Sequence, residues 1–178
     1  MAASRSRSPF PALVLVVVLA LAAAFAPAYL RAAQTLAALQ DGDEAAIASH
    51  VDIAALRADL KGDVARALDA HYDESGADAA AKSIAAMIVA PFAGAMIDQF
   101  ASPEALARVT RAALDGEPRR DFPGLVVFAA ARGAFASWDA FRVRLDDGEN
   151  ATVLQFGRRN GLDWRLVGVD LPADALTR

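Results

Sequence analysis

The chain of 178 residues contains no cysteine, only two histidines and few aromatic residues (7 %). Without cysteine it forms no disulfide, offers no thiolate to a metal ion, and has no thiol nucleophile or lipidated cysteine. All 22 acidic residues follow residue 40, and from Arg31 onward 16 Lys and Arg are outnumbered by 22 Asp and Glu, a net charge of −6 with neutral histidines. This acidic balance disfavours a nucleic-acid partner.

Charge is also absent from the N-terminal segment, where Ser8 to Leu30 is a run of 23 uncharged residues. A helix of that length is sufficient to cross a bilayer. Arg5 and Arg7 precede the run and mainly acidic residues follow it, which predicts a cytoplasmic N-terminus and an exported remainder. We therefore expect a single-pass anchor in the bacterial inner membrane and a periplasmic, extracytoplasmic domain.

A cleaved signal peptide is the alternative, because Ala24-Phe25-Ala26 forms a small-x-small pattern at a suitable distance from the N-terminus. Pro27 opposes cleavage directly after this pattern, so we expect the segment to be retained. In either case residues 1–30 are the membrane anchor or signal segment, and residues 31–178 form a single extracytoplasmic domain.

Residues 31–115 show the three- and four-residue spacing of apolar side chains that is typical of amphipathic helices. A turn at residues 41–43 separates a first helix from a short second one, and Asp52 is placed as the N-cap of the longest helix. Ser102 and Pro103 predict the start of a later helix. The apolar stripe of the longest helix consists of Ile53, Leu56, Leu60, Val64 and Leu68. Residues 116–124 have the composition of a loop that ends this helical half.

The uncharged segment from Ser83 to Ile97 has 15 residues, with Pro91 at its centre. It is too short to span a bilayer, and we expect two helical pieces or one kinked helix. Since the domain is rich in alanine and has few large apolar side chains, we expect Phe92 and Met96 to be buried in the core. Their expected neighbours are Phe141, Val143 and Leu154. The alternative is an apolar surface that meets lipid or a partner helix.

Residues 125–172 change to the period-two alternation of β-strands. Asn160-Gly161 is a tight-turn signal, and a phase shift near Gly168 indicates a β-bulge. The strands expected from this pattern are 141–145, 152–156 and 162–171, with 133–137 as a candidate fourth strand. The expected class is therefore α+β, with helices packed on an antiparallel sheet of three to four strands.

His71 is the one residue with a catalytic interpretation, because Asp69, Asp73 and Glu74 are close to it in sequence. A partly buried histidine near a helix end is the simpler interpretation, since neither His50 nor any nucleophile has a matching position. The sequence has no glycine-rich phosphate loop, no H-E-x-x-H and no G-x-S-x-G motif. We therefore assign no catalytic, cofactor-binding or metal-ligating residue and expect no cofactor.

Arg142, Arg144 and Arg165 are predicted on one face of the sheet, where they could hold an anionic head group or phosphate. Acidic residues alternate with them along the same stretch of chain, namely Asp139, Asp146, Asp163 and Asp170. This mixture favours a solvated face with salt bridges over a binding site.

Several short motifs occur in a characteristic order along most of the chain. They are Pro27-Ala28-Tyr29, Leu39-Gln40-Asp41-Gly42-Asp43, Val51-Asp52-Ile53, Leu56-Arg57, Ser102-Pro103-Glu104, Phe141-Arg142-Val143 and Trp164-Arg165-Leu166. This order resembles a family of uncharacterised bacterial membrane-anchored proteins that share a domain of unknown function, and the resemblance implies no particular activity. The order of helices before strands is also loosely similar to the cystatin-like and NTF2-like cone folds.

Together these observations favour a membrane-anchored envelope protein whose α+β module binds a protein partner or lipid without catalysis. The rival hypothesis is a small pocket enzyme of unknown reaction that uses His71 with a nearby carboxylate. An open, polar pocket that reaches His71 would favour the enzyme, whereas a filled apolar interior would favour the binding module.

Overall fold

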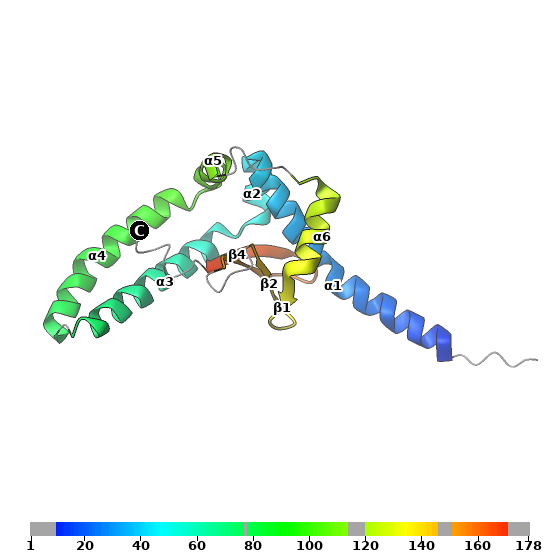
Figure 1. Cartoon of the computed structure of the whole chain (residues 1–178), viewed down its shortest axis with the longest axis horizontal. Helices are drawn as coiled ribbons and strands as arrows, with labels where there is room; N and C mark the ends of the chain where they lie inside the picture. The colour runs from blue at the N-terminus through cyan, green and yellow to red at the C-terminus, as the bar shows by residue number, and fades with distance from the viewer. Residues whose placement is uncertain (1–9, 77, 114–119, 146–150, 171–178) are drawn as a thin grey trace, which may run out of the picture.

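The computed structural model describes residues 10–76, 78–113, 120–145 and 151–170 of the chain (Figure 1). Helices come first along the chain and strands follow, so the class is α+β as expected. The helices are α1 (Phe10–Asp41), α2 (Glu44–His50), α3 (Ile53–Glu74), α4 (Ala79–Phe100), α5 (Pro103–Ala113) and α6 (Phe122–Arg132). The strands are β1 (Gly133–Phe135), β2 (Ala140–Arg144), β3 (Val153–Arg158) and β4 (Trp164–Asp170).

The sheet is an antiparallel meander in the order β1-β2-β3-β4, which includes the candidate fourth strand. In the β3–β4 pair, Gln155 lies opposite Gly168 while the next residue, Phe156, lies opposite Leu166. Val167 is therefore the extra residue of a β-bulge. This position confirms the phase shift that the sequence predicts near Gly168.

The core lies between one face of the sheet and the helices α1, α2, α3, α5 and α6. Along β2, Phe141 and Val143 are buried while Arg142 and Arg144 are exposed, as the period-two pattern predicts. Small side chains of α1 allow this helix to lie close to the sheet, and Ala28 and Ala32 are fully buried. The largest buried side chains are Trp164, Phe141, Phe156, Ile47, Leu56 and Leu125.

The predicted helix starts of α2 and α3 are confirmed by their caps. The Asp43 carboxylate accepts a hydrogen bond from the Ala46 N–H, and the Asp52 carboxylate accepts one from the Ala55 N–H, each at 3.0 Å. The Asp52 N–H also donates to the carbonyl of Leu166 at 2.8 Å, which joins the start of α3 to β4.

Helix α6 shows that the predicted start of the sheet half at residue 125 is wrong. The Asp121 carboxylate accepts a hydrogen bond from the Gly124 N–H at 3.0 Å, and Pro123 lies in the first turn, a combination that favours a helix start. The following residues are nearly all apolar, so they give no amphipathic signal that distinguishes a helix from a buried strand. Of the predicted loop at 116–124, residues 116–119 lie outside the described residues, and residues 122–124 are instead the first turn of α6.

Helix α1 is a single helix of 32 residues that passes through Pro27 and joins the N-terminal uncharged run to the domain. Figure 1 shows its beginning directed away from the sheet and the other helices. Among the residues whose side chains are described, which begin at Ala22, no helix is long and apolar enough to cross a membrane.

Helices α3 and α4 form a long hairpin that extends from the body on the side opposite to the start of α1 (Figure 1). We call this hairpin the α3–α4 arm. Its base is held to β4 through α3, while the principal neighbours of α4 are α3 and α5. The arm therefore places α4 away from the sheet.

Candidate functional site

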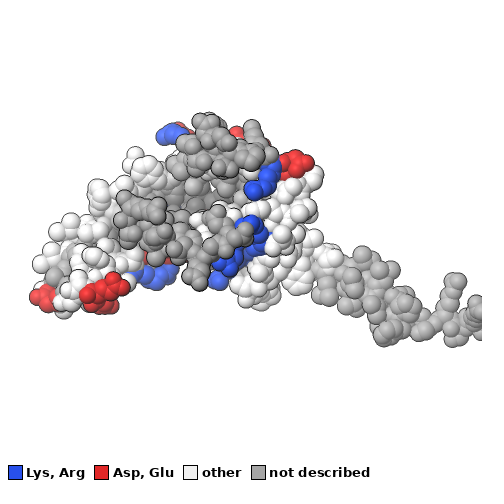
Figure 2. All heavy atoms as spheres, viewed as in Figure 1, with Lys and Arg blue, Asp and Glu red and all other residues white. Residues whose placement is uncertain are grey.

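The outer face of α4 carries a row of large apolar side chains in solvent, which corrects the expectation that this segment is buried in the core. The row is Ile84, Ile88, Phe92, Met96 and Phe100, and we call it the apolar stripe. Their exposed fractions range from 44 % at Met96 to 69 % at Phe92. Met87 lies beside the stripe and is 76 % exposed. The space-filling view in Figure 2 shows few charged side chains over α4.

The inner face of α4 explains why these large side chains point outward. Ala90, Ala93 and Gly94 line the contact with α3, and an added Cβ at Gly94 would lie 3.7 Å from the Cε of Lys61. Small residues at four-residue spacing allow two helices to approach closely. Most side chains that α4 turns toward α3 are thus small, with Ile97 as a larger one, while a row of large apolar side chains lies outside.

Pro91 lies within α4, which is one continuous helix and not two pieces. Proline has no backbone N–H, so the carbonyl of Met87 lacks its helical donor. Pro91 also lines an open groove of about 420 Å³ between α3 and α4. The proline therefore lies between the groove and the apolar stripe.

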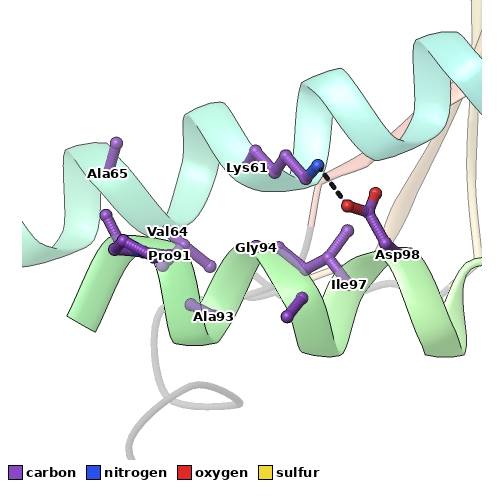
Figure 3. Close-up of a pocket in the computed structure, with 10 residues that line it drawn as sticks. Lys61, Val64, Ala65, Pro91, Ala93, Gly94, Ile97 and Asp98 are labelled. Carbon is purple, nitrogen blue, oxygen red and sulfur yellow. Dashed lines mark hydrogen bonds and ion pairs between the residues drawn. The ribbon is translucent and has the colours of Figure 1, made fainter. Parts of the chain in front are cut away.

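The groove is mainly apolar and has one ion pair at its edge (Figure 3). Lys61 Nζ of α3 lies 2.8 Å from Asp98 Oδ2 of α4. Arg57 Nε lies 3.9 Å from the other oxygen of Asp98 and donates to the carbonyl of Ala101 at 2.9 Å. These contacts tie the base of α4 to α3.

His71 lies outside the residues that line this groove. It is exposed near the end of α3, where its ring is 5.7 Å from that of Tyr72, and Asp69, Asp73 and Glu74 are also exposed. The structure therefore places His71 away from this groove. Among the described residues, no group of three or more His, Asp or Glu side chains could hold a metal ion.

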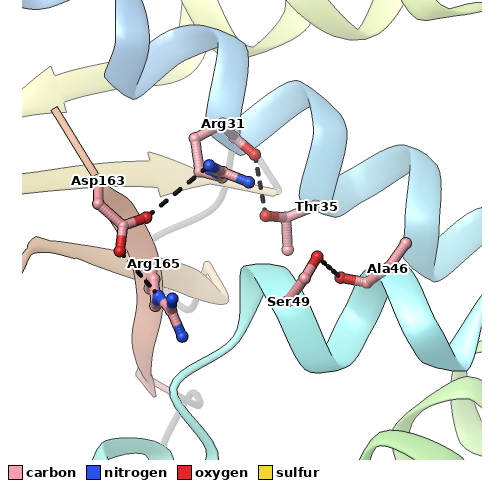
Figure 4. A network of polar contacts seen from close by, with 6 residues as sticks. All are labelled: Arg31, Thr35, Ala46, Ser49, Asp163 and Arg165. Carbon is pink, nitrogen blue, oxygen red and sulfur yellow. Dashed lines mark hydrogen bonds and ion pairs between the residues drawn. The ribbon is translucent and has the colours of Figure 1, made fainter.

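A polar network joins α1 to the start of β4 (Figure 4). His50 is the last residue of α2, and the charges of Arg31 and Arg165 in this network act on it. Arg31 Nη2 lies 3.8 Å from one oxygen of Asp163, and Arg165 Nε lies 3.1 Å from the other. Burial, followed by the positive charge of Arg31, lowers the pKa of His50 below its ordinary value of 6.5.

The predicted arginine row does not converge on one point. Arg165 on β4 is paired with Asp163, just before that strand, whereas Arg142 and Arg144 are exposed on β2, and β3 lies between these strands. The ion pair at Arg165 agrees with the salt-bridged interpretation of this face.

Asp59 positions the arm on the sheet, a role that its sequence pattern does not reveal. Its Oδ2 accepts a hydrogen bond from the Val169 N–H at 3.2 Å, 110 residues along the chain. Burial and the nearby charge of Asp63 raise the pKa of Asp59 above its ordinary value of 3.8. In the sequence, Asp59 lies among the charged residues of the polar face of α3, so no signal separates it from its neighbours.

A family model described as "Protein of unknown function (DUF2939)" matches residues 16–109. This match covers slightly more than half of the chain, from α1 into α5, and the chain belongs to that family. No curated protein matches the chain, and no solved structure matches it. The likeness to cystatin-like and NTF2-like folds thus rests on the order of elements alone.

Proposed function

We propose that the protein is a non-catalytic binding module of the cell envelope, held at a membrane by its N-terminal segment, whose α4 surface binds a protein partner. The observation that carries this proposal is the apolar stripe, five large exposed side chains at four-residue steps on one helix. Single exposed apolar residues are common, but a contiguous row of them is typical of an interaction surface.

A helix of the partner is the occupant that fits the stripe. Side chains at positions i and i+4 form a ridge that packs into the groove beside the matching ridge of a second helix. The segment from Ser83 to Ile97 has no charge, so burial of apolar area is the source of affinity and ion pairs are not. Charged residues flank the segment and leave the stripe itself uncharged.

Two observations favour protein over lipid as the partner of α4. Helices that lie on anionic lipid carry many Lys and Arg residues on their polar face, but α4 has a single lysine, Lys82. In addition, α4 lies on the side of the molecule opposite to the start of α1 (Figure 1). The stripe is therefore distant from the bilayer that the N-terminal segment would enter.

Membrane attachment through a retained N-terminal segment is supported by the uncharged run and by the packing of α1. The Phe25 and Phe135 rings are 4.8 Å apart in an edge-to-face contact, and Arg158 Nη2 donates to the carbonyl of Ala24 at 3.4 Å. Cleavage after Ala26 would remove both contacts. The basic residues before the run support a cytoplasmic N-terminus and a periplasmic domain.

Photo-crosslinking of the full-length chain in membranes tests the α4 surface. Phe92→benzoylphenylalanine should give a protein adduct after irradiation, and adding Ile88→Asp should abolish it. The matched control is Val127→benzoylphenylalanine, which places the same group at an exposed position on α6 and should give no such adduct. An adduct of twice the chain mass identifies a second copy as the partner. Only lipid adducts at position 92, or none, would contradict the proposal.

A further inference from the structure

Two turns of the sheet lie at the same end of the molecule. In an antiparallel meander the first and third connections share one end, so the β1–β2 turn at residues 136–139 neighbours the β3–β4 turn at residues 159–163. The Arg158 N–H donates to the carbonyl of Asp139 at 2.9 Å and joins the two turns. We call this region the turn end.

The turn end exposes large apolar side chains next to arginine. Trp138 is 71 % exposed in the first turn and Leu162 is 60 % exposed in the second. The guanidinium of Arg158 lies 5.6 Å from the centre of the Trp138 ring and 4.9 Å from that of Trp164. Within the part of the chain that the structure describes, the guanidinium of Arg158 contacts the two indole rings and the carbonyl of Ala24.

The positive and negative charges at and around the turn end nearly balance. The bases are Arg31, Arg158, Arg159 and Arg165, and the acids are Asp52, Asp139 and Asp163. Arg159 is 2.7 Å from Asp52 and Arg165 is 3.1 Å from Asp163. The turn end thus lacks the acidic excess of the whole domain, and it does not repel anionic head groups as strongly.

Helix α1 leaves the domain at this same end, because Ala24 and Phe25 contact Arg158 and Phe135. From Phe10 to Ala23 the helix has only 14 residues before these contacts begin. At about 1.5 Å per residue they span about 21 Å, less than the ~30 Å hydrocarbon core of a bilayer. The uncharged run can cross the hydrocarbon core of the bilayer only if residues Ala24 to Leu30 also lie in the membrane or at its surface.

We propose that the turn end rests on the lipid head groups, with Trp138 and Leu162 inserted at the membrane interface and Arg158 beside the phosphates. This inference rests on the proposed membrane attachment of the N-terminal segment and adds a lipid-contacting surface to the folded domain. Tryptophan favours the interface because its ring is apolar and its N–H is polar, and arginine pairs with phosphate oxygens. The short free length of α1 forces this end of the sheet toward the bilayer.

Tryptophan fluorescence tests the inference directly, because the chain has two tryptophans, one exposed and one fully buried. The full-length chain is reconstituted into vesicles of phosphatidylcholine and phosphatidylglycerol that contain lipids brominated near the head group. Contact with bromine should quench Trp138, at most about half of the total emission, the share of one tryptophan in two. The Trp138→Phe variant keeps only Trp164 and should show little quenching.

A second variant separates the turn end from the arm. Adding Phe92→Trp to the Trp138→Phe chain places an exposed tryptophan on α4, and this residue should stay unquenched. If Trp138 is not quenched while the chain floats with the vesicles, the turn end does not contact lipid and the membrane attachment still stands. If the chain does not float with the vesicles, the attachment itself is wrong and this inference fails with it.

Discussion

Gly168 permits the contact between α3 and β4. A Cβ at this position would clash with the carboxylate of Asp59, whose Oδ2 also accepts the Val169 N–H. The absence of a side chain at Gly168 therefore matters for close approach, and not for an unusual backbone angle. This contact fixes the base of the arm on the sheet.

Gly168→Ala should lower the free energy of unfolding by about 1–3 kcal/mol, because the added methyl group overpacks the contact with Asp59. The control is Gly62→Ala in α3, where the nearest atom lies 3.9 Å away. Replacing a helical glycine there should raise stability by about 0.5–1 kcal/mol. Denaturant unfolding measures both, and equal effects of the two substitutions would refute the assigned role of Gly168.

His50 should make stability depend on pH. Because burial and Arg31 lower its pKa in the folded chain, the unfolded chain takes up the proton first as pH falls below 6.5. The stabilisation that comes from keeping His50 neutral is thus fully present above the pKa of the unfolded chain, and it is lost as pH falls from that value through the lower pKa of the folded chain. His50→Gln should reduce the loss of unfolding free energy between about pH 7.5 and about pH 5.5. Any packing cost of glutamine applies at both pH values, and parallel curves for the two proteins would contradict this prediction.

Helix α4 gives the clearest test of the fold. Phe92→Ala should change the free energy of unfolding by less than about 0.5 kcal/mol, because an exposed side chain loses little on truncation. Phe141→Ala is the matched control on β2, where the ring is fully buried and truncation should cost about 3–5 kcal/mol. Thermal or denaturant unfolding measures the difference. A large cost at Phe92 would show that α4 is buried after all.

Local signals predict elements well in this chain, while packing partners are poorly predicted. Asp52 and Ser102 mark the starts of α3 and α5 because the capping hydrogen bonds form within three residues. The burial of α4 depends instead on which side of the helix faces α3. Ala90 and Gly94 decide this by their small size, and hydrophobicity alone assigns the same segment to the core.

The turn end is a second feature that the sequence does not predict, because it depends on contacts between distant parts of the chain. Trp138 and Leu162 are separate residues in two turns, and neither belongs to a motif. Only the sheet topology brings the two turns to one end, and the contacts of Ala24 and Phe25 with Arg158 and Phe135 place that end beside α1. Pairings at such sequence separation leave no periodic signal in a single sequence.

For the whole molecule, cell fractionation decides between a retained anchor and a cleaved signal. A periplasm-active reporter fused after Arg178 should be active and should sediment with the membranes, because α1 continues from the uncharged run into the domain. The mature N-terminus should be that of the full chain. Activity in the soluble periplasm, with a mature N-terminus near Phe25 to Tyr29, would instead indicate cleavage.

The continuity of α1 determines how the domain would be oriented relative to the membrane. Each residue advances an α-helix by about 100°, so one alanine inserted between Ala22 and Ala23 would turn everything after it by that angle and move it by about 1.5 Å. An insertion of seven residues would restore nearly the same heading at a greater height. Because α1 is one continuous helix, a change in its length would both rotate and displace the domain. The rotational position of α1 in the membrane would therefore set the direction in which the α3–α4 arm points.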